Sequence, residues 1–212
     1  MAEHRLFPAG AVPEVSTPEF HAHRDRAPHL EQPGHRPRLL RAAQLVMDAA
    51  DRYAPGGGRW HESTPWPVTV SDLGCGDGGL LSLVRRMVAR AWGYDFQPSN
   101  AAGWAERGVT AAALDVFGAD RDKVRLGDVT VMTEVLEHLA DPHGAARWVA
   151  GRSRFLVASS PWDETPQAHD ECHAWAWDLD GYSRMLAAAG WSVLRHEPVG
   201  RFQVVLAERV AA

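Results

Sequence analysis

A glycine-rich segment, Asp72-Leu73-Gly74-Cys75-Gly76-Asp77-Gly78-Gly79, constrains the fold of this chain more than any other part of the sequence. It directly follows residues 68–73, a short β-rich run typical of a buried parallel strand, and it directly precedes an apolar segment typical of a helix. Its glycines carry no Cβ, so the backbone can turn tightly and approach a ligand closely. A glycine-rich turn between a strand and a helix lies where open α/β sheets bind ligands.

Strand-like and helix-like segments alternate along the rest of the chain. Helices are predicted over residues 39–53, 80–89, 98–107, 142–151 and 179–189, with the first stopped by residues 55–58, and strands over residues 68–73, 90–94, 109–114, 129–132, 155–158, 191–195 and 202–207. The last two strands are too close in the chain for a parallel crossover, so they must pair antiparallel. We therefore expect an α/β fold of the Rossmann-like type: a seven-stranded, mostly parallel sheet with helices on both faces and one reversed strand, the last, at its edge.

Residues 1–36 differ in composition from residues 37–212, which are expected to form a single domain. Five of the eleven histidines lie in this first segment, together with prolines at positions 8, 13, 18, 28 and 33. Proline at this density excludes a long helix, so we expect an irregular arm. The arm is either a partly disordered tail or a lid over the active site, since long ordered loops in compact domains are usually lids or binding loops.

Acidic residues end two of the predicted strands. Asp95 closes the second strand, where a carboxylate can accept hydrogen bonds from both hydroxyls of a ribose. Asp115 follows the third strand. Aspartate also favours strand ends because it stabilises turns, so a turn role stays open for both residues.

These segments resemble the class I S-adenosylmethionine-dependent methyltransferases. The first motif of that family, Asp/Glu-hydrophobic-Gly-x-Gly-x-Gly, matches residues 72–78, and Thr133-Glu134-Val135-Leu136-Glu137-His138-Leu139, after a strand, looks like the fourth motif. The resemblance implies that Asp95 binds the ribose, that Asp115 lies at the adenine edge and that Val116 supplies a backbone amide. It places the following residues at the cofactor: Asp72, Gly74, Cys75, Gly76, Gly78, Asp95, Phe96, Asp115, Val116 and Thr133. Gly79 also fits the spacing of a dinucleotide-binding loop, so a dehydrogenase stays open.

Candidate catalytic residues follow from the same resemblance. His138, His173 and Glu134 are expected near the transferred methyl group, as acceptor-positioning groups or bases, since imidazole titrates near neutrality. Glu134, Glu137 and His138 would share one face of a helix, and together with His173 they could bind Mg²⁺ or Mn²⁺. This pattern is similar to that of small-RNA 3′-terminal 2′-O-methyltransferases. The alternative is that the carboxylates serve a helix N-terminus while the imidazoles line a pocket.

The net charge bears on which class of molecule accepts the methyl group. The net charge of -5, from 22 basic and 27 acidic side chains, does not indicate a surface that grips a long phosphate backbone. We therefore expect methyl transfer to an N, O or C atom of a small molecule, with an RNA 3′ end as the first alternative and a non-catalytic cofactor-fold protein or a dehydrogenase as the second. Trp162, Trp175 and Trp177 are expected beside the substrate.

The sequence also bears on where in the cell the protein is located. No apolar run is long enough to span a bilayer, so no membrane contact is expected. The first residues lack the apolar core of a signal peptide, and the two cysteines do not form a Cys-x-x-Cys pair. A cytoplasmic location is the expectation.

Overall fold

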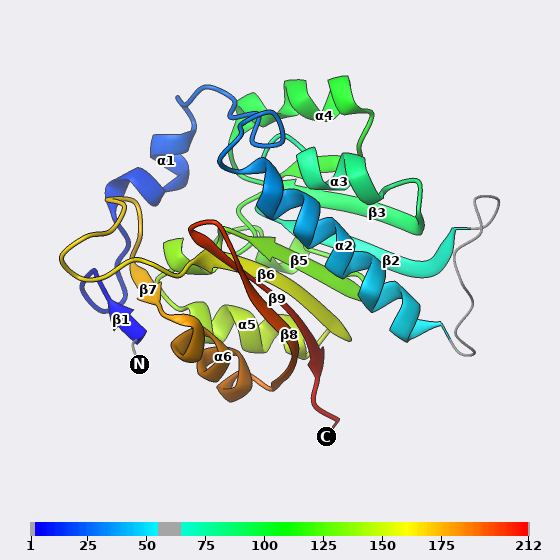
Figure 1. Cartoon of the computed structure of the whole chain (residues 1–212). Helices are drawn as coiled ribbons and strands as arrows, with labels where there is room; N and C mark the ends of the chain where they lie inside the picture. The colour runs from blue at the N-terminus through cyan, green and yellow to red at the C-terminus, as the bar shows by residue number, and fades with distance from the viewer. Residues whose placement is uncertain (1–2, 55–64, 212) are drawn as a thin grey trace.

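A seven-stranded sheet forms the centre of the computed structural model, which describes residues 3–54 and 65–211 (Figure 1). Its strands are β2 (Trp66–Leu73), β3 (Val88–Asp95), β4 (Ala111–Ala113), β5 (Val129–Thr133), β6 (Phe155–Pro161), β8 (Trp191–Val199) and β9 (Phe202–Arg209). They lie in the order β4-β3-β2-β5-β6-β9-β8, and β9 is antiparallel to both of its neighbours. The predicted mostly parallel sheet is confirmed, but the reversed strand lies between β6 and β8 rather than at the edge.

Helices cover both faces of this sheet (Figure 1). They are α2 (Arg36–Tyr53), α3 (Gly79–Val84) and α4 (Ala101–Arg107) on one face, and α5 (Pro142–Ala150) and α6 (Leu179–Ala188) on the other. Side chains alternate along a strand, so Phe155 and Val157 of β6 join the core beneath α2, whereas Leu156 and Ala158 join the core beneath α5 and α6. This two-sided burial explains why the central strands β5 and β6 carry no charged side chain.

The first predicted helix ends where it was expected to end, whereas the second ends earlier. Helix α2 ends at Tyr53, as expected, and residues 55–58 lie outside the described residues. The helix predicted over residues 80–89 is too long, because α3 ends at Val84 and Val88 already pairs with Trp66 in the sheet. The apolar pattern continues through residues 84–88, so periodicity did not mark the break.

The N-terminal arm crosses the end of the sheet (Figure 1). It contains β1 (Glu3–Arg5), a 3-10 helix (Glu14–Ser16) and α1 (Pro18–His21). Strand β1 pairs antiparallel with β7 (Trp175–Trp177) in a second, two-stranded sheet that the sequence did not predict. This pairing attaches the start of the arm to the segment that follows β6.

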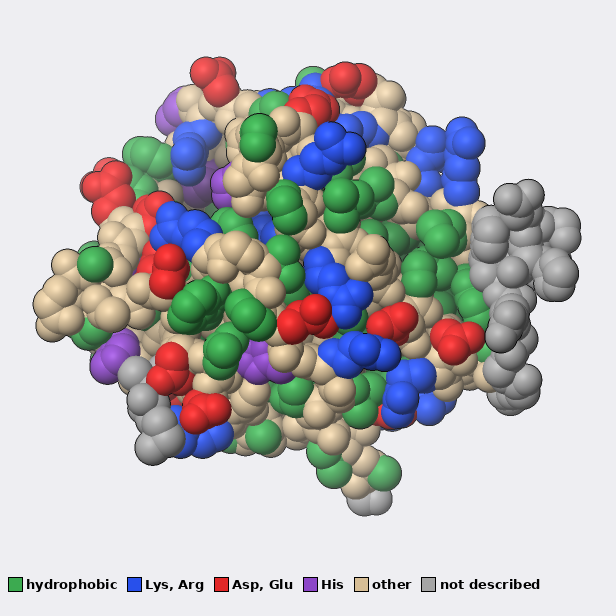
Figure 2. Space-filling model, in the orientation of Figure 1, with side chains coloured by type: hydrophobic (Ala, Val, Ile, Leu, Met, Phe, Trp, Pro, Cys, Tyr) green, Lys and Arg blue, Asp and Glu red, His purple; other side chains and the backbone are tan. Residues whose placement is uncertain are grey.

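The surface in Figure 2 carries neighbouring charges of opposite sign. Arg41 pairs with Glu197, and Arg195 pairs with Asp48 at 3.2 Å. On this face the described basic side chains therefore form no continuous stripe of the kind that follows a phosphate backbone. Within residues 3–54 and 65–211, no helix is long and apolar enough to cross a bilayer.

Candidate active site

A cavity of about 450 Å³ lies at the carboxyl ends of the parallel strands. Parallel strands end at one edge of a sheet, so the loops that follow them converge there. The walls come from the glycine-rich turn, the segments after β3, β4, β5 and β6, and the N-terminal arm. This volume is within the range of small-molecule sites, about 300–1,000 Å³.

The glycine-rich turn forms the floor of the cavity. Gly74 and Gly76 have φ values of 72° and 52°, in the left-handed region that favours glycine. A Cβ added at Gly76 would meet no protein atom within 4 Å, so this backbone faces open space. Gly74, Cys75 and Gly76 line the cavity, whereas Gly78 does not: it is the N-cap of α3. Gly78, predicted at the cofactor, therefore shapes the turn instead.

Asp95 links this turn to the next strand. Its Oδ2 accepts a hydrogen bond from Gly76 N at 2.8 Å, and its Oδ1 accepts from Gln97 N at 2.8 Å and from Asn100 Nδ2 at 3.1 Å. Burial raises the pKa of Asp95, and these three donors oppose the rise. The carboxyl group and the adjacent Phe96 both line the cavity, where the sequence placed them.

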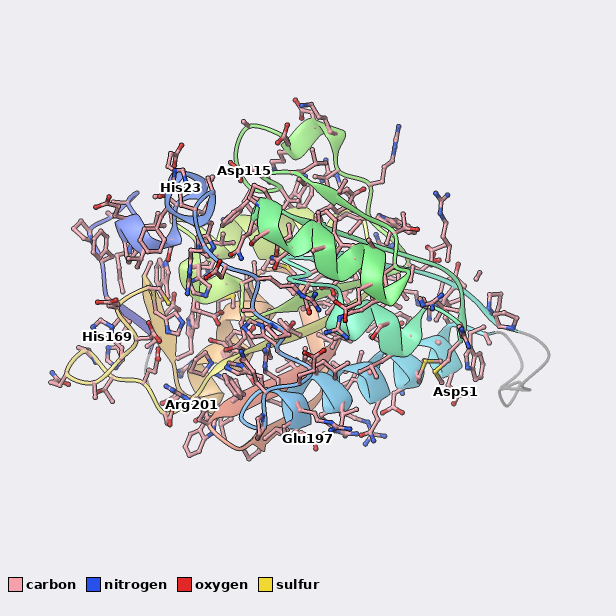
Figure 3. All side chains as sticks on the ribbon, turned by 90° about the horizontal axis from the view of Figure 1, so that it is seen from above. His23, Asp51, Asp115, His169, Glu197 and Arg201 are labelled. Atoms are coloured by element: carbon pink, nitrogen blue, oxygen red, sulfur yellow. The ribbon has the colours of Figure 1, made fainter. Side chains whose placement is uncertain are left out.

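Asp115 does not line the cavity. Its Oδ1 accepts from Gly118 N at 3.0 Å and its Oδ2 accepts from Ala119 N at 3.3 Å, so the side chain stabilises its own turn. Figure 3 labels Asp115, which lies in the segment after β4. This is the turn role that the sequence left open, and a position of Asp115 at an adenine edge stays a prediction. Val116 does line the cavity, as predicted, with Leu114 and Phe117 beside it.

Two buried polar side chains, Asp72 near the end of β2 and Arg38 in α2, lie at the cavity wall. Each is 1% exposed, and Asp72 Oδ1 and Arg38 Nε lack hydrogen-bond partners. Burial, and then the charge of Asp95, raise the pKa of Asp72 to about 8, while Arg38 opposes the rise. Both residues line the cavity, and each has a buried polar atom that no other described protein group satisfies. The sequence analysis missed Arg38, which reads as an ordinary helix residue.

The segment after β5 does not form the predicted helix. Glu134 has φ of 57°, unusual for a residue other than glycine, and only Leu136–His138 form a 3-10 turn. Glu134 and Thr133 line the cavity, and Glu134 Oε1 accepts from Ser159 Oγ at 2.8 Å. Burial raises the pKa of Glu134. The shared helix face expected for the two glutamates and the histidine is therefore absent from this segment.

Glu137 is fully buried and does not line the cavity. Neither of its carboxylate oxygens has a hydrogen-bond partner. Burial, and then the charge of Glu134, raise the pKa of Glu137 well above its ordinary value, which favours the neutral acid.

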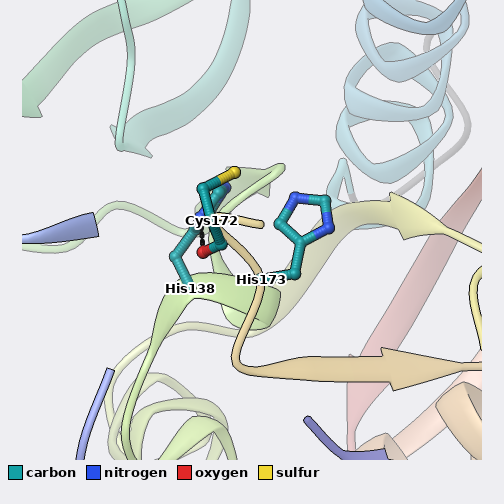
Figure 4. A group of neighbouring side chains, drawn as sticks. All are labelled: His138, Cys172 and His173. Atoms are coloured by element: carbon teal, nitrogen blue, oxygen red, sulfur yellow. Dashed lines mark hydrogen bonds between the residues drawn. The ribbon is translucent and has the colours of Figure 1, made fainter. Parts of the chain in front are cut away.

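His138 and His173 do lie together. Their rings are edge to face with centroids 4.8 Å apart, and both line the cavity beside Cys172 (Figure 4). Within the described parts of the chain, these three side chains are the group whose potential ligand atoms lie within 4.8 Å of one another. Neither Glu134 nor Glu137 belongs to it, so the carboxylate-rich set expected for Mg²⁺ or Mn²⁺ is not assembled.

Glu164, in the segment after β6, was missed by the sequence analysis. Its Oε2 lies 2.6 Å from His173 Nδ1, and the two side chains are 2% and 8% exposed. The residues are nine positions apart in an irregular segment, so no periodicity connected them.

The arm contributes a further wall of the cavity through Ser16, His21, His29 and His35. His21 Nδ1 lies 2.8 Å from Gln97 Oε1. His29 stacks on His35 with ring centroids 4.6 Å apart, and burial lowers the pKa of His29 to about 4. The richness of the arm in histidine was the signal for this wall, but the sequence did not reveal which histidines face inward.

The tryptophans expected beside the substrate lie elsewhere. Trp175 and Trp177 are buried in the core with parallel rings 5.9 Å apart, and Trp162 is partly exposed. None of the three lines the cavity, whose aromatic walls are Phe96, Phe117 and Phe202. Core packing therefore accounts for the two buried tryptophans.

Comparisons with known proteins agree with this geometry. A family model described as a methyltransferase domain, Methyltransf_23, matches residues 34–196. The N-methyltransferase NodS from Bradyrhizobium japonicum WM9, solved with S-adenosylhomocysteine, is 15% identical over 91% of this chain and 96% of its own, with a TM-score of 0.65. Magnesium protoporphyrin IX methyltransferase from Synechocystis PCC 6803, also with S-adenosylhomocysteine, is 16% identical over 81% and 86%, with a TM-score of 0.57. No curated protein matches the sequence.

Proposed function

This chain belongs to the methyltransferase-domain family and is a class I S-adenosylmethionine-dependent methyltransferase; from this premise we propose that it methylates a small molecule bound in the cavity at the end of the sheet. The observation that carries the proposal is the convergence of Asp72, the Gly74–Gly76 turn and Asp95 on one cavity. The acceptor takes the remaining space.

The cavity residues fit the cofactor part by part. Asp95 oxygens retain lone pairs for two ribose hydroxyls, and the open backbone at Gly76 permits close approach. Buried Asp72 and Arg38 have a polar atom each to offer to the ammonium and carboxylate of an amino acid. When bound, S-adenosylmethionine supplies an electrophilic methyl group. The apolar wall at Leu114, Val116 and Phe117 suits a flat adenine ring.

The arm, residues 1–36, is proposed as a lid. Its described part contacts opposite walls: Ser16 Oγ donates to the carbonyl oxygen of Cys172, and Arg26 Nε lies 3.2 Å from Asp77 Oδ2. A cover of this kind excludes water from the reacting groups. Under it, His138, His173 and Glu134 are proposed to position the acceptor.

The size and enclosure of the cavity favour a small acceptor. Residues of the arm line the cavity, and among the described residues the four expected metal ligands do not form one group. One structural neighbour is an N-methyltransferase and another is a magnesium protoporphyrin IX methyltransferase, so likeness of fold alone does not select an acceptor.

Calorimetric titration tests the cofactor assignment. We expect S-adenosylhomocysteine to bind, with or without Mn²⁺, and NAD not to bind. Asp95→Ala should weaken binding roughly 10- to 100-fold, because hydrogen bonds to a charged group contribute about 1.5–3 kcal/mol. Asp51→Ala is the matched control, because Asp51 is exposed and lies at the opposite end of the molecule from Arg201 and His169 (Figure 3). Binding of NAD alone, or equal affinities of the Asp95→Ala variant and the wild type, would overturn the proposal.

A further inference from the structure

Glu164 fixes the protonation of one cavity histidine. An ionised carboxylate only accepts hydrogen bonds, so the contact of 2.6 Å with His173 Nδ1 requires a proton on that nitrogen. The lone pair of neutral His173 then lies on Nε2. The imidazole faces the side chains of His138 and Cys172 at the cavity wall (Figure 4).

Glu164 is itself held in place. Its Oε1 accepts from Asp170 N at 3.1 Å and lies 3.4 Å from a guanidinium nitrogen of Arg201. Because both oxygens of Glu164 are held in place, the imidazole that donates to this carboxylate is held in place too. The negative charge of Glu164 also stabilises the positive charge that His173 acquires when it takes up a proton. The arrangement is that of an oriented base.

His138 lacks such a partner. Its Nδ1 lies 3.0 Å from the carbonyl oxygen of Cys172, and burial, together with the neighbouring His173, lowers the pKa of His138 to about 3. It therefore stays neutral near pH 7. Of the two imidazoles, only His173 has a buried carboxylate beside it.

We propose that the methyl acceptor is a hydroxyl oxygen, that His173 Nε2 takes the hydroxyl proton, and that Glu164 is the positioning residue for His173. The inference rests on the proposed methyltransferase function. A neutral amine attacks with a lone pair that is already free, whereas a hydroxyl is a weak nucleophile until a base removes its proton. An oriented imidazole–carboxylate pair is therefore what a hydroxyl acceptor needs.

The step balances. The acceptor O–H bond breaks as its proton moves to Nε2, and an oxygen electron pair forms the new bond to the methyl carbon. The electrons of the carbon–sulfur bond stay on sulfur, which becomes a neutral thioether. The imidazolium, beside Glu164, returns its proton to solvent after product release.

Nuclear magnetic resonance of ¹⁵N-histidine-labelled protein with S-adenosylhomocysteine tests the pair without an acceptor. We expect His173 to carry its proton on Nδ1 in the wild type, and Glu164→Gln to lose this tautomer preference. Glu171→Gln is the matched control, because Glu171 is an exposed carboxylate of the same segment that does not line the cavity. A proton on Nε2 in the wild type overturns the inference.

A matched series of small phenols and the corresponding anilines, assayed with methyl-labelled S-adenosylmethionine, tests the acceptor class. We expect label in phenols, and kcat lowered on the order of 10²-fold by Glu164→Gln with KM little changed. Glu164→Asp should recover part of the rate, and Glu171→Gln should match the wild type.

The pH profile separates positioning from a merely structural role. The charged or titratable groups around His173 are Glu164, Asp170, Arg201, His138, Cys172 and Glu134. Removing the Glu164 charge should shift the acidic limb of kcat to lower pH, because the imidazolium loses its counter-charge. Label in anilines alone, or an unshifted limb, overturns the inference. Failure to bind S-adenosylhomocysteine would instead overturn the proposed function.

Discussion

Replacing Asp72 by asparagine is expected to stabilise the fold while it weakens cofactor binding. Asp72 is 1% exposed, its Oδ1 has no partner, and burial together with Asp95 raises its pKa to about 8. The native state therefore holds a proton that the unfolded chain releases near pH ~4. As pH rises between these two values, ionisation of Asp72 stabilises the unfolded state, whereas the native state stays protonated. The free energy of unfolding therefore falls. Asparagine has no charge to bury.

The magnitude follows from the pKa. Each pKa unit is worth about 1.36 kcal/mol, so the penalty approaches roughly 4 kcal/mol at pH 7 and levels off at about 5–6 kcal/mol above pH 8. Water entry and local relaxation reduce such values, so we expect a gain of about 2 kcal/mol or more for Asp72→Asn at pH 7. In a domain of this size, about 1 kcal/mol shifts Tm by roughly 2–4 °C.

Scanning calorimetry of wild type, Asp72→Asn and the exposed control Asp51→Asn between pH 4.5 and 9 measures the effect. The Tm advantage of Asp72→Asn should be small near pH ~4.5, grow as pH rises, and level off above pH ~8. Asp51→Asn should follow the wild type. An advantage that is constant or shrinks as pH rises would refute this reasoning. In the same samples, S-adenosylhomocysteine should bind Asp72→Asn less tightly than the wild type.

Three further outcomes are expected. Gly78→Ala should lower stability by about 1 kcal/mol or more, measured by urea unfolding, because Gly78 has φ of 82° at the start of α3; unchanged stability would contradict that strain. Arg26→Ala should speed release of S-adenosylhomocysteine several-fold in stopped-flow experiments, because it removes the contact between the arm and Asp77; an unchanged rate would argue against the lid. Cys75 and Cys172 should react slowly with iodoacetamide at pH 8 in native protein and quickly in urea, because burial raises the pKa of both thiols; fast native reaction would show that the thiols are accessible.

The sheet and the cofactor loop could be predicted because local pattern encodes them. Residues 68–73 are a short β-rich run, and Gly74 and Gly76 adopt left-handed conformations that favour glycine, so the local sequence predicts both the strand and the turn. The helix predicted over residues 80–89 was five residues too long, since Val84, Met87 and Val88 continue the apolar spacing of a helix although Val88 begins β3. The pairing of β1 with β7 was not predictable, because the two strands lie far apart in the sequence and no local pattern connects them.

Some residues of the candidate site could also be predicted from the sequence, and others could not. Asp72, Gly76 and Asp95 lie on one cavity as the motif spacing predicted. The helix expected to align Glu134, Glu137 and His138 is absent, because Glu134 adopts a left-handed conformation and only Leu136–His138 form a 3-10 turn. Asp115 took its alternative role in a turn.

The sequence by itself determined the class of the protein: a strand, a glycine-rich turn and a helix, followed by a carboxylate at the next strand end, are local signals with few conformations to choose from. Only the tertiary structure decided which other side chains surround the cofactor loop. It brought Arg38 to Ser159, Glu164 to His173, and the histidines of the arm to the cavity. These contacts join residues on separate segments, and packing, not spacing along the chain, decides which side chains meet.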